Sequence, residues 1–259
     1  MPYSSRGEAG QSAREIIVAV GSASNPIGYI DVKGEIKGYD PAVLRAVDDL
    51  LQQYTFKFEA TEMKNILVGL EVGQYDIGAH IFTWTQERAN TFVVGSRPYG
   101  SHNYGLAVVK GRKDIQSFRD LEGKKVITDT GSAESFYLNK YNEEAAKTPI
   151  EIVFGEVTTD AVVKGLLEGR YDVKIAQMST FKRYLSAYPD SLERVGKDNI
   201  IPGYYYHYFA KGQEQLRDDV DAAIQQLKDS GRLRELSIEY LGDDYTLNED
   251  IKDPGHWEY

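Results

Sequence analysis

The chain has 259 residues, 41% of them hydrophobic, which is enough for one large domain or two moderate ones with packed cores. Its formal charge is −10 and it has no long basic run, which argues against nucleic acid as a partner, because phosphate binding needs clustered Lys and Arg. The lack of cysteine excludes disulfides, thiolate metal sites and thiol catalysis, and no segment approaches the roughly 18 apolar residues of a membrane span.

The first 14 residues are small, polar and rich in Gly and Ser. They lack the apolar core of a signal peptide, so we expect a disordered tail. Such a tail fits either a cytosolic protein or one whose export signal has been removed.

The first half of the chain alternates strands with helices. Asp40 is expected to cap a helix with Pro41 at its first position, and apolar residues recur at helical spacing from Val43 to Leu51. A second helix is expected from near Asn65 to Gly73. Strands are expected at 15–20, 55–58 and 75–79.

The second half continues the alternation, which indicates an α/β fold. Two closing helices end at Gly231 and Gly242, and the polar tail 243–259 is expected to fray or to wrap the surface. The other expected elements are strands at 105–109, 125–128, 151–154 and 172–175, with helices from about 132 and at 160–167.

One internal echo stands out: Gly69-Leu-Glu-Val-Gly-Gln-Tyr-Asp76 resembles Gly165-Leu-Leu-Glu-Gly-Arg-Tyr-Asp172. Any helix–Gly–strand junction looks similar, but two related α/β lobes explain the echo better. Ligands of open α/β sheets lie beyond the carboxyl ends of the strands. We therefore expect the segments after four strands to meet at one cleft: 21–25, 79–83, 130–134 and 176–179.

Several motifs together resemble a known family, the extracellular solute-binding proteins (family 3) of polar amino-acid ABC transporters. The matching stretches are Gly38–Asp40, Gly69–Asp76, Thr83–Arg88, Ser96–Tyr99, Asp120–Val126 and Leu227–Leu233. Three further stretches look most like the cystine-binding branch: Tyr54–Phe58, Asn65–Leu67 and Asp76–His80.

The resemblance implies a two-lobed type II periplasmic-binding-protein fold with two hinge crossings, near 100–104 and 204–208. Lobe 1 is expected at 15–102 and 207–259, and lobe 2 at 103–206. The implied function is the substrate-binding protein of an ABC importer, not an enzyme, which captures an amino acid by lobe closure. The best ligand is L-cystine or a related sulfur-containing or polar amino acid.

The same resemblance sets the expected partners and location. The partners are the small amino-acid ligand and the permease of the transporter, without cofactor, metal or nucleic acid. The protein is expected to be a monomer in the periplasm or a lipoprotein on the cell surface. Its contact with the membrane is expected only through a lipid anchor that has been removed.

In lobe 1 the resemblance implies that Arg88 clamps the ligand's α-carboxylate, for which the planar guanidinium fork is suited. Without the family resemblance, the sequence alone would suggest that Arg88 forms a solvated ion pair with Glu87 on a helix surface. Thr83 is expected to join the carboxylate site, to cap a helix, or both.

In lobe 2 the family places backbone N–H groups of a helix start against the carboxylate, here at Ser132, Ala133 and Glu134. The alternative is an ordinary helix N-terminus, above all for Glu134. Gln177 departs from many relatives, which have an aspartate for the ligand's amino group; Gln offers only a neutral acceptor.

Four more residues complete the expected site. Ser24 and Met63 stand where other receptors of the family often place aromatics, although Met63 also fits simple packing. Phe82 flanks the exit of the lobe 1 strand. His80 either lines the cleft or has a structural role.

Two other classes of function remain open at this point. Cyclohexadienyl dehydratases resemble these receptors, and such an enzyme needs a carboxylic acid in the cleft, with Glu134 or Asp129 as candidates. A ligand-sensing or adhesin domain uses the same fold. The four histidines show no metal-ligand spacing.

Overall fold

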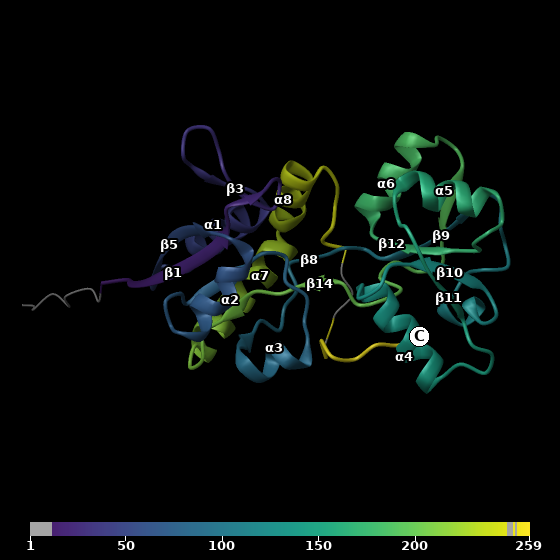
Figure 1. Cartoon of the computed structure of the whole chain (residues 1–259). Helices are drawn as coiled ribbons and strands as arrows, with labels where there is room; N and C mark the ends of the chain where they lie inside the picture. The colour runs from purple at the N-terminus through teal and green to yellow at the C-terminus, as the bar shows by residue number, and fades with distance from the viewer. Residues whose placement is uncertain (1–11, 248–250, 252) are drawn as a thin grey trace, which may run out of the picture. The chain divides into compact units, whose positions relative to one another are not determined.

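The computed structural model describes residues 12–247, 251 and 253–259. Residues 1–11 of the expected tail at 1–14 lie outside the described residues. The chain divides into two compact units (Figure 1). Unit 1 comprises residues 1–100 and 205–254, and unit 2 comprises 101–204 and 255–259.

Unit 1 is built on a five-stranded sheet in the order β5-β1-β6-β15-β7. The strands are β1 (Arg14–Gly21), β5 (Tyr54–Thr61), β6 (Ile77–Ala79), β7 (Val93–Val94) and β15 (Tyr208–Phe209). β1 pairs in parallel with β5 and β6, whereas β15 runs antiparallel to β6 and β7. The interior strand β1 is buried along Val18–Gly21, as expected for a strand covered on both faces.

Helices cover both faces of this sheet. Apolar side chains of α1 (Tyr39–Leu50), α7 (Glu214–Asp229) and α8 (Arg232–Leu241) form one core with β1, β5 and β6. α2 (Met63–Glu71) meets the sheet separately at Gly78, through Ile66 and Leu70. The remaining elements are the short helix α3 (Gln86–Thr91) and a small sheet of β2 (Ala23–Ser24), β3 (Gly28–Ile30) and β4 (Ile36–Lys37).

Unit 2 has the same architecture. Its strands are β9 (Gly105–Val109), β10 (Lys125–Thr128), β11 (Glu151–Phe154), β12 (Lys174–Ala176) and β13 (Leu192–Val195). Its helices are the 3-10 turn η1 (Phe118–Leu121), α4 (Ala133–Glu144), α5 (Thr159–Leu167) and α6 (Met178–Ala187). α4 packs on one face of the strands, and α5 and α6 pack on the other (Figure 1).

The two units repeat one strand order. β10 pairs in parallel with β11, a parallel bridge joins Val126 to Val173 just before β12, and β12 and β13 flank β9 antiparallel. The order β11-β10-β12-β9-β13 therefore corresponds to β5-β1-β6-β15-β7. This agreement supports two related lobes over a chance echo.

The two similar segments, Gly69–Asp76 and Gly165–Asp172, form the same local structure in both units. Gly69 and Gly165 each lie under a tyrosine ring: an added Cβ would meet Tyr75 or Tyr171 at 2.3 Å. The aspartate that follows the tyrosine then accepts a backbone N–H from the neighbouring strand, at 2.9 Å for Asp76 from Ile17 and at 2.8 Å for Asp172 from Lys125. Each motif thus locks a helix end to the start of β6 or β12.

Asp40 and two elements of unit 2 differ from the sequence-based expectations. α1 begins at Tyr39 with Gly38 as its N-cap, so Asp40 lies inside the helix and does not cap it. Helix α6 and strand β13 were not expected at all. α6 follows β12 with only Gln177 between them, and this short connection concealed its start.

The chain crosses between the units at Gly100/Ser101 and Tyr204/Tyr205, in the short paired strands β8 (Gly100–Ser101) and β14 (Tyr204–Tyr205). A third crossing precedes Gly255, because the final five residues belong to unit 2 and not to the segment 207–259 expected in lobe 1. There the Trp257 ring lies 5.0 Å from that of Phe118 and 4.7 Å from that of Tyr137, and its Nε1–H donates to the carbonyl of Ile200 at 3.0 Å.

Substitution of Gly165 by Ala is expected to destabilise the protein by about 1–3 kcal/mol, because the new methyl group collides with the Tyr171 ring. Leu167→Ala on the same helix is the matched control; that side chain is exposed, and its loss should change stability by no more than about 0.5 kcal/mol. Urea unfolding measures both. Equal stability of the two variants would contradict the packing role of Gly165.

Substitution of Trp257 by Ala removes its ring contacts with Phe118, Tyr137 and Tyr259 and one hydrogen bond, and we expect it to lower the stability of unit 2 by about 2 kcal/mol. His256→Ala, on an exposed neighbour, serves as control. Hydrogen exchange should show faster opening of η1 and α4 only in the Trp257 variant. Unchanged exchange in both would mean that the tail contributes nothing to unit 2.

Candidate functional site

A buried network fixes the turn that follows β6 in unit 1. The backbone N–H of Ile81 donates to the Asp40 carboxylate and meets the Tyr99 hydroxyl, both at 3.1 Å, and that hydroxyl donates to Asp40 at 2.8 Å. Ile81 has a φ of 44°, which is strained for a β-branched residue. The His207 ring stacks on Tyr99 at 4.0 Å. The network therefore holds a turn that the chain alone does not favour.

Arg88 is held on the far side of that turn. Its guanidinium donates to the carbonyl of Thr83 at 2.9 Å and lies over the rings of Phe82, at 5.3 Å, and Tyr208, at 5.8 Å. The Tyr208 hydroxyl donates to the same carbonyl at 2.8 Å. Arg88 is half-buried, so the reading as a solvated surface pair with Glu87 does not describe it.

The helix cap next to Arg88 is Thr85. Its side chain accepts the backbone N–H of Arg88 at 3.2 Å, so the capping role considered for Thr83 falls to Thr85. Thr83 lies in the loop between β6 and α3, half-buried. Its expected contact with the ligand stays a prediction.

His80 and Phe82 lie on the same turn. His80 packs on Gly21 at the end of β1, where a Cβ would come within 2.5 Å of its Nδ1, and burial lowers its pKa. Phe82 is buried with its ring edge against Tyr208. Both side chains thus stiffen the turn, and a role in ligand contact stays a prediction.

The other two expected residues of unit 1 are less enclosed. Ser24 ends β2 and is half-buried. Met63 is the first residue of α2 and is 54% exposed, so it is not core packing.

In unit 2 the start of α4 follows β10 as expected. Ser132 is the N-cap: its hydroxyl accepts the backbone N–H of Ser135 and contacts the Thr128 hydroxyl, both at 3.0 Å. Ala133 is exposed and Glu134 is half-buried. The N–H groups of the first turn carry the positive end of the helix dipole, which suits an anion.

Ser132, Glu134 and Gln177 come together in one cavity of about 290 Å³, which we call the unit 2 hollow. It is lined by Asp129, Ser132, Glu134, Val157, Lys174, Ala176, Gln177, Thr180, Arg183 and Tyr184. The hollow lies at the carboxyl ends of β10 and β12, where ligands of α/β sheets bind. Of the lobe 2 candidates, only Ala133 does not line it.

The Gln177 amide is fixed by a bond to the Tyr104 hydroxyl at 3.0 Å, which uses one N–H and leaves the amide oxygen free to accept from a ligand. Lys174 is the lining residue that sequence reasoning missed. It sits inside a strand, where a lysine reads as solvent-facing, yet its side chain is only 5% exposed.

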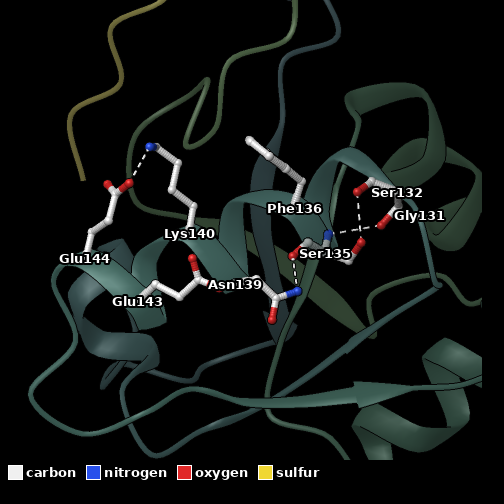
Figure 2. A pocket seen from close by; sticks show the side chains of 8 residues that line it. All are labelled: Gly131, Ser132, Ser135, Phe136, Asn139, Lys140, Glu143 and Glu144. Carbon is white, nitrogen blue, oxygen red and sulfur yellow. Dashed lines mark hydrogen bonds and ion pairs between the residues drawn. The ribbon is translucent and has the colours of Figure 1, made fainter.

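A second hollow of unit 2 runs along the outer flank of α4 (Figure 2). Phe136 on this flank is 62% exposed, and Lys140 pairs with Glu144 at 2.6 Å. Ser132 belongs to both hollows, but the flank otherwise carries a solvated helix face.

The part of the chain that the structure describes contains no group of three or more His, Asp or Glu side chains that could hold a metal ion. Nor is any helix within those residues long and apolar enough to span a bilayer.

Burial raises the pKa of Asp40 to about 7, against the opposing hydrogen bonds from Tyr99 and Ile81. The folded state thus holds this proton more tightly than the unfolded chain, so the stability it contributes at low pH is lost as the pH rises to about 7. The unfolding free energy of the wild type, relative to Asp40→Asn, should fall by up to about 4 kcal/mol between pH 4 and pH 7.5. Urea unfolding of both proteins across this pH range tests the prediction. A difference in unfolding free energy that stays constant with pH would contradict it.

Comparison with known proteins gives a consistent result. The profile of the bacterial extracellular solute-binding proteins, family 3, matches residues 16–243. The L-cystine-binding protein TcyK of Bacillus subtilis (strain 168) is 31% identical over 240 residues, which cover 92% of this chain and 88% of that protein.

Solved structures agree. The probable amino-acid ABC transporter extracellular-binding protein YtmK of Bacillus subtilis has a TM-score of 0.66 at 31% identity, over 90% of this chain and all of that one. The L-cystine solute receptor of Neisseria gonorrhoeae, in its unliganded open conformation, has a TM-score of 0.68 at 23% identity, over 90% and 95% of the two chains. The fold is the type II periplasmic-binding-protein fold, and the chain belongs to the bacterial extracellular solute-binding proteins, family 3.

Proposed function

We propose that this protein is the substrate-binding subunit of an ABC importer and that its ligand is L-cystine or a closely related sulfur-containing amino acid. Membership of the solute-binding family supports the binding role, and the relatives TcyK and YtmK are named for cystine and for amino-acid transport. None of these names denotes an enzyme.

The observation that carries the proposal is the fixed guanidinium of Arg88. One N–H is held by the Thr83 carbonyl, while the rings of Phe82 and Tyr208 support the group. A carboxylate can then bind without first ordering a flexible side chain, and a paired guanidinium–carboxylate contact is charge-assisted. Arg88 is therefore suited to hold the α-carboxylate of an amino acid.

In the proposed mechanism the ligand first binds unit 1 through Arg88 and Thr83. Unit 2 then adds the N–H groups at Ser132 and the amide of Gln177, and the two units close around the ligand. Binding favours the closed state only by the ligand's greater affinity for it. The permease of the importer recognises that state.

The proposal also places the protein outside the cytoplasm, where solute-binding subunits meet their ligands. The absence of cysteine fits a disulfide ligand, because a thiolate in the receptor would exchange with it.

Isothermal titration calorimetry with L-cystine and the standard amino acids tests the ligand. Arg88→Ala should weaken binding about 10- to 150-fold, the equivalent of about 1.5–3 kcal/mol for a charged hydrogen bond. Arg88→Lys keeps the charge but loses the planar guanidinium, so its affinity should lie between those of the wild type and Arg88→Ala.

Arg232→Ala is the matched control, because that exposed arginine pairs with Glu235 on α8. Thermal melting should show each variant folded. Undiminished affinity in Arg88→Ala removes Arg88 from the site, and a wild type that binds other amino acids but not cystine refutes the ligand assignment.

A further inference from the structure

The last five residues make a third covalent link between the two units, in addition to the crossings in β8 and β14. Residues up to 254 belong to unit 1, whereas residues 255–259, which we call the C-terminal strap, belong to unit 2. The family resemblance implies only two crossings. The third crossing is therefore a feature of this chain that the expected hinge does not explain.

The chain is fixed to unit 1 shortly before it leaves that unit. Tyr245 and Thr246, which follow α8, are each only 6% exposed. The backbone N–H of Tyr245 donates to the Ser237 hydroxyl at 2.8 Å, and that of Thr246 donates to the Asp244 carboxylate at 2.9 Å. The Arg234 guanidinium of α8 also donates to Asp244, at 3.1 Å. The start of the link therefore moves with unit 1.

The other end of the link is fixed to unit 2 by aromatic side chains. Trp257 packs on η1 and α4 as described above, and its ring lies 4.7 Å from that of Tyr259. The Tyr259 ring lies 5.0 Å from that of Tyr141, and its hydroxyl donates to the Glu144 carboxylate at 2.8 Å. Edge-to-face ring contacts of this kind add to the energy of simple burial. The strap is therefore docked on unit 2 by several contacts that act together.

The length of the connection limits how far its two ends can separate. Leu247 and Gly255 are eight residue steps apart in the sequence. A fully extended chain of that length spans at most about 28 Å. Any movement of the units that required a longer distance between these two residues would have to pull the strap off unit 2.

We propose that the C-terminal strap restrains the opening of the two units in the ligand-free receptor. A hinge joined only by β8 and β14 samples a wide set of open conformations, and closure around a ligand gives up that freedom. A docked strap removes the widest of these conformations from the start. A larger fraction of the molecules then stays ready to close.

Distances between the units can be measured cleanly in this protein, because the chain has no native cysteine that would also take a label. Val68→Cys on α2 and Lys164→Cys on α5 place one spin label on each unit, at exposed and equivalent positions of the duplicated helices. Double electron–electron resonance of the labelled, ligand-free protein then gives the distribution of distances between the units.

Two variants of the labelled protein release the restraint in different ways. Deletion of residues 255–259 removes the strap. An insertion of about ten Gly and Ser residues after Leu247 keeps every contact of the strap but adds up to about 35 Å of reach. The same insertion after Gly34, at the exposed tip of the β3–β4 hairpin, is the matched control, because it leaves the link between the units unchanged.

The deletion and the insertion after Leu247 should both broaden the distribution toward distances that the parent protein does not reach. The control insertion should reproduce the parent distribution. An insertion after Leu247 that leaves the distribution unchanged would overturn the proposal whatever the deletion does, because the strap would then act only through packing within unit 2. The readout needs no ligand, so a failure to bind cystine, which would refute the proposed function, leaves this test intact.

Discussion

The carboxyl group of Asp40, buried at the start of α1, accepts the backbone N–H of Ile81 and the hydroxyl of Tyr99. Ile81 is a β-branched residue in the left-handed region, a conformation that costs on the order of 1–3 kcal/mol. Without these bonds the turn after β6 would relax, and the Thr83 carbonyl that orients Arg88 would move with it. The geometry of the guanidinium therefore depends on a contact between Asp40 and Ile81, which lie 41 residues apart in the chain.

In each unit, the fold places the segment that follows β6 or β12 at the carboxyl end of that strand. In both units a glycine under a tyrosine ring ends a helix, and the next aspartate binds the backbone of the neighbouring strand. β6 and β12 consequently enter their sheets in equivalent positions. Their carboxyl ends lead to the Arg88 turn in unit 1 and to the hollow around Lys174 in unit 2, so a duplicated frame carries two different sets of side chains.

Local signals in the sequence account for much of this frame. Strand β11 was expected at 151–154 and lies there, and Gly231 and Gly242 end helices as their positions predicted. Asp40 was misread because an Asp–Pro pair is typical of a helix start, whereas its partners lie far away in sequence. Lys174 was missed for a similar reason: only the tertiary fold shows that this strand has no solvent face. The apolar spacing of Phe181, Tyr184, Leu185 and Tyr188 could have revealed α6.

The central claim is that Arg88 binds the carboxylate of an amino acid. A crystal structure of the protein grown with L-cystine tests it most directly. The account predicts two hydrogen bonds of about 2.7–2.9 Å between the Arg88 guanidinium and one cystine carboxylate. Cystine bound elsewhere, with the side chain of Arg88 turned toward solvent, would contradict it.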